Sequence, residues 1–222
     1  MIVENIEILE YNKDIMEFKG VDFKSMPIDQ WLYFCKANLT FGEPGIDYYE
    51  LAALHQACEI FGKRSLTIVE TGMCFGTTTR YFLVRVIKYG GELHTFEVTI
   101  RDKFKETMQE LGLWDKINLH GHSMKDPWSK EIDVLFIDSE HALENTLGEY
   151  MHFREWLKAD SIIGFHDTNC CTGVIKALEM IQEVDELELI SECSDRAHAG
   201  VKFFRRKIKN RTDRPWNTGK RI

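Results

Sequence analysis

The sequence has none of the long apolar runs that cross membranes. A membrane-spanning helix needs about 20 consecutive apolar residues, and no run in the chain approaches that length. The first residues, MIVENIEILEYNKD, have neither the basic nor the apolar segment of a signal peptide. Basic residues are outnumbered, because 28 Lys and Arg face 36 Asp and Glu, which gives a net charge of −8. We therefore expect a cytoplasmic protein whose partners include no membrane and no nucleic acid.

The cysteines lack the spacing of a zinc-binding or redox motif. None of the six forms a C-x-x-C pair, so the paired ligands of a typical zinc site are missing. Cys170 and Cys171 are adjacent, and neighbouring cysteines make a poor disulfide. We expect reduced thiols in a reducing compartment.

Two common phosphate-binding motifs are also missing from the most distinctive stretch, Thr67–Thr79 (TIVETGMCFGTTT). Its spacing, E-x-G-x-x-x-G, matches neither G-x-G-x-x-G nor G-x-x-x-x-G-K-[ST]. The pattern predicts a buried strand, a tight turn from Gly72 to Gly76, and a helix whose first N–H groups face the strand end. Glycine lets a ligand approach the backbone closely. The turn is therefore a candidate ligand site, although the same glycines are also found in purely structural turns.

The order of the predicted elements indicates a single α/β domain. A chain of 222 residues can bury one full core. Predicted strands cover residues 67–71, 92–98, 117–123, 133–138, 161–167, 187–193 and 200–206, and helices cover 77–88, 101–112, 141–157 and 172–183. Strands that alternate with helices in this way form a mainly parallel, doubly wound sheet with helices on both faces. We expect this domain to cover residues 46–207.

Flanking segments complete the predicted organisation. Residues 1–45 form an N-terminal cap segment, with strand-like pieces at 6–11 and 16–23 and a helix after Pro27. Residues 208–222 form a basic C-terminal tail, which is either solvated or docked on an acidic surface.

Polar residues stand where the predicted strands end: Glu70, Glu97, Ser123, Asp138 and Asp167. In open α/β sheets, ligands bind outside the carboxyl ends of the strands. Acids at these positions also cap the helices that follow, which is the simpler explanation for each acid taken alone. Four acids at successive strand ends favour a ligand site.

Glu97 lies 25 residues beyond Gly72, at the end of the second predicted strand. A carboxylate there can accept hydrogen bonds from both hydroxyls of a ribose and would repel a 2′-phosphate. We therefore expect a nucleoside with free ribose hydroxyls rather than NADP.

A second group lies in FIDSEH (136–141) and GFHDT (164–168). Asp138 and Asp167, at the ends of adjacent strands, can converge on one Mg²⁺ ion. His141 lies near the start of a helix and can take a proton from a substrate hydroxyl; the alternative is a helix-entry residue bonded to nearby backbone. His166 precedes Asp167 in the strand, so strict alternation turns it away from Asp167 and predicts a supporting position.

These motifs together resemble those of a known family. VETGMCFGTTT, the acid of HTFEV, the pair VLFIDSEH and IIGFHDT, and the terminal GVKFFRR are similar to the corresponding segments of class I S-adenosylmethionine-dependent methyltransferases. Within that class the chain looks most like the small-molecule O-methyltransferases, a branch that includes catechol O-methyltransferase and the cephalosporin-biosynthesis-like enzymes. The similarity covers roughly residues 45–207.

The resemblance implies a Rossmann-like seven-stranded sheet with an antiparallel last strand, and S-adenosylmethionine bound at the first turn. It assigns Glu70, Gly72, Phe75 and Gly76 to the methionine part of the cofactor, Glu97 to the ribose and Ser123 to the adenine. Thr77 and Asp138 complete the cofactor-binding set. The metal carboxylates are Asp138 and Asp167, and His141 stands where the catechol enzyme has a lysine base. Thr168 replaces an asparagine metal ligand, and Asn169 comes one residue too late.

The sequence thus predicts an enzyme that transfers a methyl group to a hydroxyl of a small molecule (phenol, diol or sugar), with Mg²⁺ assisting and His141 and Asp138 as catalytic residues. The small-molecule substrate is the expected partner, and a homo-oligomer is possible. Two alternatives stay open at this point: a nicotinamide-dependent oxidoreductase, and a non-catalytic nucleoside-binding protein of the same fold.

Overall fold

Seven strands form one sheet at the centre of the computed structural model, which describes residues 14–37, 46–195 and 198–207. The strands are β1 (Leu66–Thr71), β2 (Gly91–Phe96), β3 (Ile117–His120), β4 (Ile132–Ile137), β5 (Leu157–His166), β6 (Leu187–Cys193) and β7 (Val201–Arg206). Their order is β3-β2-β1-β4-β5-β7-β6. β7 runs antiparallel to both neighbours, whereas the pairings among β1 to β5 are parallel. The predicted sheet with an antiparallel last strand is confirmed.

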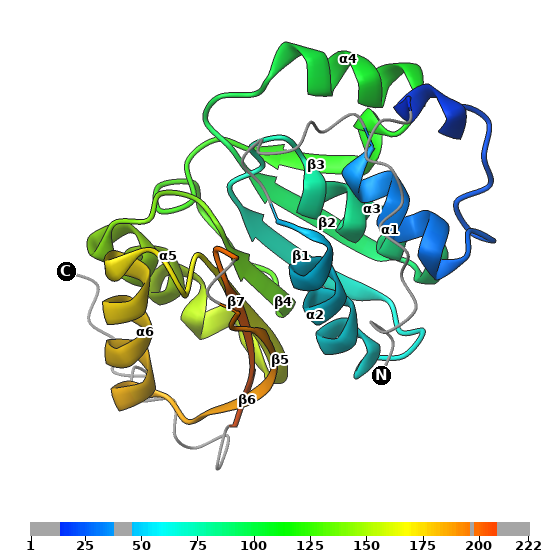
Figure 1. Ribbon diagram of the computed structural model, residues 1–222. Helices are drawn as coiled ribbons and strands as arrows, with labels where there is room; N and C mark the ends of the chain where they lie inside the picture. Colours follow the sequence, from blue (N-terminus) through cyan, green and yellow to red (C-terminus); the bar gives the residue numbers. More distant parts are fainter. Residues whose placement is uncertain (1–13, 38–45, 196–197, 208–222) are drawn as a thin grey trace.

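Helices cover both faces of this sheet (Figure 1). They are α1 (Ile28–Lys36), α2 (Tyr48–Glu59), α3 (Thr77–Tyr89), α4 (Asp102–Glu110), α5 (Leu143–Phe153) and α6 (Thr172–Val184). The first four contribute to a core that includes Ile68 and Phe136, whereas α5 and α6 pack in a second core with Val69 and Leu135. Successive strand residues enter opposite cores because side chains alternate across a sheet, which explains the apolar runs of the central strands.

The N-terminal segment differs from one sequence prediction. Ile15–Phe18 form a 3₁₀ helix, not the strand predicted over 16–23. Ile15 and Phe18 are both buried and three residues apart, so one helical turn places both against the core. The other strand-like piece (6–11) and the basic tail lie outside the described residues.

The strands position the predicted site residues at one edge. β1 lies between β2 and β4, and β4 pairs with β5, so the segments that follow β1, β2, β4 and β5 emerge side by side. The point between β1 and β4 is where the strand order reverses, which is the usual ligand position in such sheets. Among the described residues, no helix has the length and apolar character needed to cross a membrane.

Candidate active site

The turn after β1 requires glycine at two positions. Gly72 has φ +82°, and a Cβ there would lie 2.1 Å from the carbonyl oxygen of Asp138. Gly76 has φ +75° and caps α3, where a Cβ would lie 2.0 Å from the Phe104 ring. Left-handed backbone and close contacts both exclude larger residues. The turn is thereby pressed against the end of β4 on one side and against α4 on the other.

Glu97 holds this turn from the end of β2. Its carboxylate accepts hydrogen bonds from the N–H groups of Met73 (2.9 Å), Cys74 (3.3 Å) and Thr99 (2.9 Å). Two carboxylate oxygens can accept about four hydrogen bonds, so capacity for a hydroxyl donor remains. The structure therefore places the predicted ribose acceptor directly beside the glycine turn.

A pocket of about 420 Å³ opens over the ends of β1 to β4. Its lining includes four residues that follow successive strands, namely Gly72, Glu97, Ser123 and Ser139. Ser123, the predicted adenine contact, donates its hydroxyl to Glu149 of α5 at 2.5 Å. Glu149 also accepts from Ser139 (2.7 Å) and Thr71 (2.9 Å). Burial raises the pKa of Glu149, although these three hydroxyl bonds oppose the rise.

Glu149 is a site residue that the sequence reasoning missed. It stands in the middle of a predicted helix, where a glutamate gives no local signal. Its role is visible only in the structure, where it accepts hydrogen bonds from hydroxyls of β1 and of the segments after β3 and β4. These bonds hold the three segments together beside the pocket.

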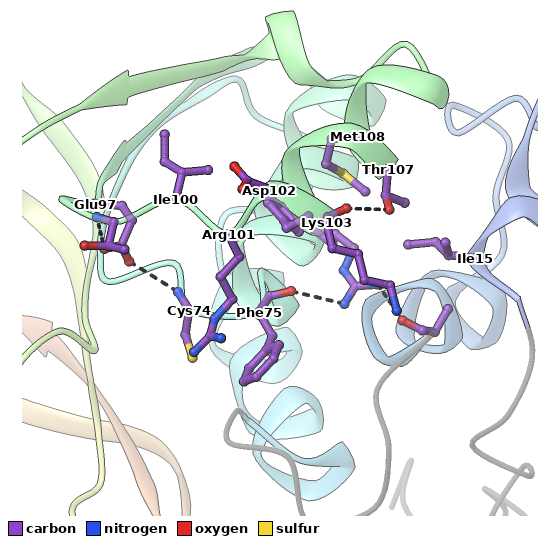
Figure 2. A pocket seen from close by; sticks show the side chains of 14 residues that line it. Ile15, Cys74, Phe75, Glu97, Ile100, Arg101, Asp102, Lys103, Thr107 and Met108 are labelled. Carbon is purple, nitrogen blue, oxygen red and sulfur yellow. Dashed lines mark hydrogen bonds between the residues drawn. The ribbon is translucent and has the colours of Figure 1, made fainter.

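A larger pocket of about 770 Å³ adjoins the first at Cys74 and Glu97, which line both. Figure 2 shows Phe75 on its wall, with the Arg101 side chain extending toward it; the guanidinium carbon lies 4.0 Å from the ring centroid. Phe75 therefore belongs to the wall of this pocket, and Gly76, the next residue, begins α3 as its N-cap. Thr77, also predicted to bind the cofactor, is buried, and its hydroxyl has no hydrogen-bond partner among the described residues.

Glu70 does not face either pocket, contrary to its predicted contact with the methionine part. The side chain is fully buried, and its oxygens accept from Thr78 (2.5 Å), Thr79 (2.8 Å) and Thr95 (2.9 Å). Burial raises its pKa to about 7, against the effect of the hydroxyl bonds. Glu70 thus joins β1, β2 and the first turn of α3 beneath the glycine turn.

Acids and histidines converge where β4 and β5 end. His166 Nδ1 lies 2.9 Å from Asp138 Oδ1 and 3.1 Å from Asp167 Oδ2. His141 Nε2 lies 2.8 Å from Asp167 Oδ2. His166 is buried, whereas the His141 side chain is 45% exposed. The two predicted metal carboxylates and the predicted base are brought together as expected.

The orientation predicted for His166 was wrong. Strict alternation holds only for extended backbone, and Asp167 has φ +58°, in the left-handed region. The chain turns at this residue, so His166 and Asp167 point to the same place. The other ring nitrogen, Nε2, lies 3.3 Å from Glu50 Oε2 of α2. Glu50 gave no signal in the sequence beyond that of an ordinary helix cap.

The charged groups of this cluster shift one another's pKa values. Burial opposes ionisation of Asp167, yet hydrogen bonds from His141 and His166 leave its pKa well below the usual range. The bond to Asp167 raises the pKa of His141. Burial alone would lower the pKa of His166, but the surrounding carboxylates, Asp138 foremost, outweigh it and raise that pKa.

Thr168 and Asn169 stand at the position where the resemblance implies a third metal ligand. The Asn169 amide donates to the carbonyls of Asp195 (3.0 Å) and His198 (3.4 Å), so it is engaged by the loop before β7. Thr168 is buried, and its hydroxyl has no hydrogen-bond partner among the described residues. Nearby, Cys170 and Cys171 have their sulfur atoms 3.6 Å apart as free thiols. The other four cysteines are also free, as predicted.

Comparison with known proteins agrees with this geometry. Residues 69–168 match the model of a family described as a methyltransferase domain. No curated protein matches the chain. Residues 69–168 are thus similar to a methyltransferase domain, in agreement with the resemblance that the sequence motifs indicated.

Solved structures with this fold include several O-methyltransferases. An O-methyltransferase from Bacillus cereus in complex with S-adenosylhomocysteine is 14% identical, with a TM-score of 0.59 over 87% of this chain and 100% of that one. The O-methyltransferase TomG from Streptomyces achromogenes, in complex with S-adenosylmethionine, is 12% identical, with a TM-score of 0.56 over 82% and 100%. The Podospora anserina methyltransferase PaMTH1, bound to S-adenosylhomocysteine, is 15% identical, with a TM-score of 0.58 over 82% and 89%. At these identities the likeness establishes the fold.

Proposed function

We propose that this protein transfers the methyl group of S-adenosylmethionine to a hydroxyl of a small molecule, such as a phenol, a diol or a sugar, assisted by a divalent metal ion. One observation carries the proposal: Asp138, His141, His166 and Asp167 meet at the carboxyl ends of β4 and β5. Asp138 is joined by its backbone to the residue before the glycine turn, since its N–H donates to the Thr71 carbonyl at 3.0 Å. The cluster of two aspartates and two histidines therefore adjoins the glycine turn, and the two form one site.

The cofactor is assigned to the edge between β1 and β4. The smaller pocket suits the adenosine part, with Glu97 accepting from the ribose hydroxyls and Ser123 beside the adenine. Gly72, Phe75, Gly76 and Thr77 follow along the turn toward the methionine part. Glu70 contributes indirectly, by fixing the turn from below.

The cluster suits a divalent ion. One donor atom each from Asp138, His166 and Asp167 lies within 4.8 Å of the other two. Mg²⁺ is the ion that the two carboxylates favour when they are taken alone. A divalent ion held there would lower the pKa of a hydroxyl group placed beside it.

His141 is the proposed base. Its Nε2 is engaged by Asp167, which leaves Nδ1 to accept the hydroxyl proton. Asp167 fixes the ring orientation and stabilises the imidazolium that forms. Nearly half of the side chain is exposed, so a substrate oxygen can reach it. Aligning this oxygen with the sulfonium methyl then supplies much of the rate enhancement.

The first test is titration of S-adenosylhomocysteine, followed by a turnover assay that detects it as product with a panel of hydroxylated small molecules. Binding, and turnover with at least one acceptor, are expected. His141→Asn should lower turnover by about 10²-fold or more while leaving the binding of S-adenosylhomocysteine unchanged. His152→Asn, at a half-buried histidine whose Nε2 lies 3.2 Å from the Asp126 carbonyl, is the matched control.

Other outcomes separate the alternatives. No binding of S-adenosylhomocysteine would refute the proposal. Binding without turnover on any acceptor would favour the non-catalytic nucleoside-binding protein. A His141 variant that turns over as fast as an active wild type would refute the role of His141 as the base.

A further inference from the structure

We infer that the metal ion of this site is a first-row transition ion, such as Co²⁺, Mn²⁺ or Zn²⁺, held by an imidazole nitrogen of His166 together with Asp138 and Asp167. The inference deepens the proposed function, on which it rests, by replacing Mg²⁺ with a different class of ion. It depends on His166, which the sequence assigned only a supporting position.

The donor distances are those of ligands around one ion. His166 Nδ1 lies 2.9 Å from Asp138 Oδ1 and 3.1 Å from Asp167 Oδ2. Donors bound about 2.1 Å from a metal, at right angles to one another, lie about 3 Å apart. The donor oxygens of Asp138 and Asp167 lie within 4.8 Å of each other, so one nitrogen and two carboxylate oxygens can bind one ion and leave positions open for water or substrate.

Glu50 sets the ring so that Nδ1 faces the two carboxylates. Its Oε2 lies 3.3 Å from His166 Nε2. Glu50 is itself fixed, because it accepts from the N–H groups of Asp47 (2.8 Å) and Gly200 (2.7 Å) and is 1% exposed. A carboxylate that accepts the second ring N–H is the usual support of a metal-bound histidine. With Nε2 bonded to Glu50, Nδ1 faces the two carboxylates, and a shared cation would take the place of the proton that Nδ1 otherwise donates to them.

The kind of donor decides the class of ion. Mg²⁺ takes oxygen ligands almost exclusively and keeps its waters, whereas imidazole suits the later first-row ions. The Asn169 side chain, which could replace the missing asparagine, donates its amide nitrogen to the loop before β7. The remaining donors, from Asp138, His166 and Asp167, therefore include one nitrogen. A set made of oxygen atoms alone would favour Mg²⁺, whereas this set favours a first-row transition ion.

A second group near the same place competes for such an ion. His141, Asp167 and Cys171 also have donor atoms within 4.8 Å of one another. This group is more exposed and contains a thiol, so an ion bound there would show sulfur coordination. The test must separate the two groups.

The experiment titrates Co²⁺ and, separately, Mg²⁺ into chelator-treated full-length protein, by calorimetry and by the visible and near-ultraviolet absorption of Co²⁺. We expect Co²⁺ to bind at least about tenfold more tightly than Mg²⁺, without a thiolate charge-transfer band. His166→Asp, which restores an all-oxygen set, should abolish this preference without weakening Mg²⁺. Glu50→Gln should weaken Co²⁺ by about 10- to 100-fold. Cys171→Ser, which removes only the competing thiol, should bind Co²⁺ as the wild type does.

Three outcomes would overturn the inference: equal affinity for the two ions, no binding of either ion, or a thiolate band that disappears in Cys171→Ser. S-adenosylhomocysteine is titrated into every sample without metal. If it binds while Co²⁺ does not, the ion assignment fails and the methyl-donor site stands. If it does not bind to the wild type, the proposed function fails, whatever the metal result.

Discussion

The carboxyl group of Glu70 should make the stability of this protein fall as pH rises through the slightly acidic range. Glu70 is fully buried under the glycine turn, and burial raises its pKa from 4.5 to about 7. In the unfolded chain the same group titrates near its ordinary value. Between these two pKa values the folded protein holds a proton that the unfolded chain has released, so folding is favoured at the lower pH.

The size of the effect follows from the shift. Each pH unit between the two pKa values is worth about 1.4 kcal/mol, so a rise from 4.5 to about 7 corresponds to about 3 kcal/mol. The contribution is fully present below about pH 4.5 and is lost as pH passes about 7. Other groups titrate in the same range, so the effect must be isolated by comparison with a variant.

Glu70→Gln provides that comparison, because the amide keeps the shape and a hydrogen-bond acceptor but does not ionise. The measurement is urea unfolding, followed by tryptophan fluorescence, from about pH 4.5 to about pH 8. The free energy of unfolding of the wild type minus that of Glu70→Gln should fall by about 3 kcal/mol across this range. Glu131→Gln, at an exposed glutamate, is the control. Parallel pH profiles for the wild type and Glu70→Gln would refute the reasoning.

Three further predictions concern binding and turnover. Gly72→Ala should abolish measurable binding of S-adenosylhomocysteine, since its Cβ would lie 2.1 Å from the carbonyl oxygen of Asp138. Glu97→Ala should weaken that binding at least about tenfold, or about 1.4 kcal/mol. The substitution removes the carboxylate that holds the turn and that we propose accepts hydrogen bonds from the ribose hydroxyls. Turnover should fall as pH drops through a value above 6.5, because Asp167 raises the pKa of His141 and only the neutral ring is a base.

Each of these predictions has a control on the same chain. Gly112 has φ +69° but no atom within 4 Å of an added Cβ, so Gly112→Ala tests backbone strain without the clash. If it lost binding equally, the contact at Gly72 would not be the cause. Glu110→Ala, at an exposed glutamate of α4, should bind normally. If the turnover of His141→Asn still falls at low pH in the same way, a group other than His141 causes the fall.

Local sequence determined most of the fold. Strands rich in apolar residues, alternating with helices, specify a parallel sheet, because only crossover connections bury both faces of such strands. The glycines at 72 and 76 were recognisable because left-handed backbone and close contacts leave few other choices. The ends of β4 and β5 were expected to lie together, and they do. The piece at 16–23 was misassigned because a short apolar pattern does not distinguish a strand from one helical turn.

Only the tertiary structure decided which side chains share the site. His166 meets Asp138 and Asp167 because Asp167 adopts a left-handed conformation, and no sequence pattern indicates that turn. Glu50 joins them from α2, 116 residues earlier in the chain, and its spacing is that of a helix cap. Periodicity records which face of an element is buried, but it does not record which polar groups from different elements meet. The sequence therefore determined the sheet and the edge where we propose that the ligand binds, and packing alone determined which polar groups meet there.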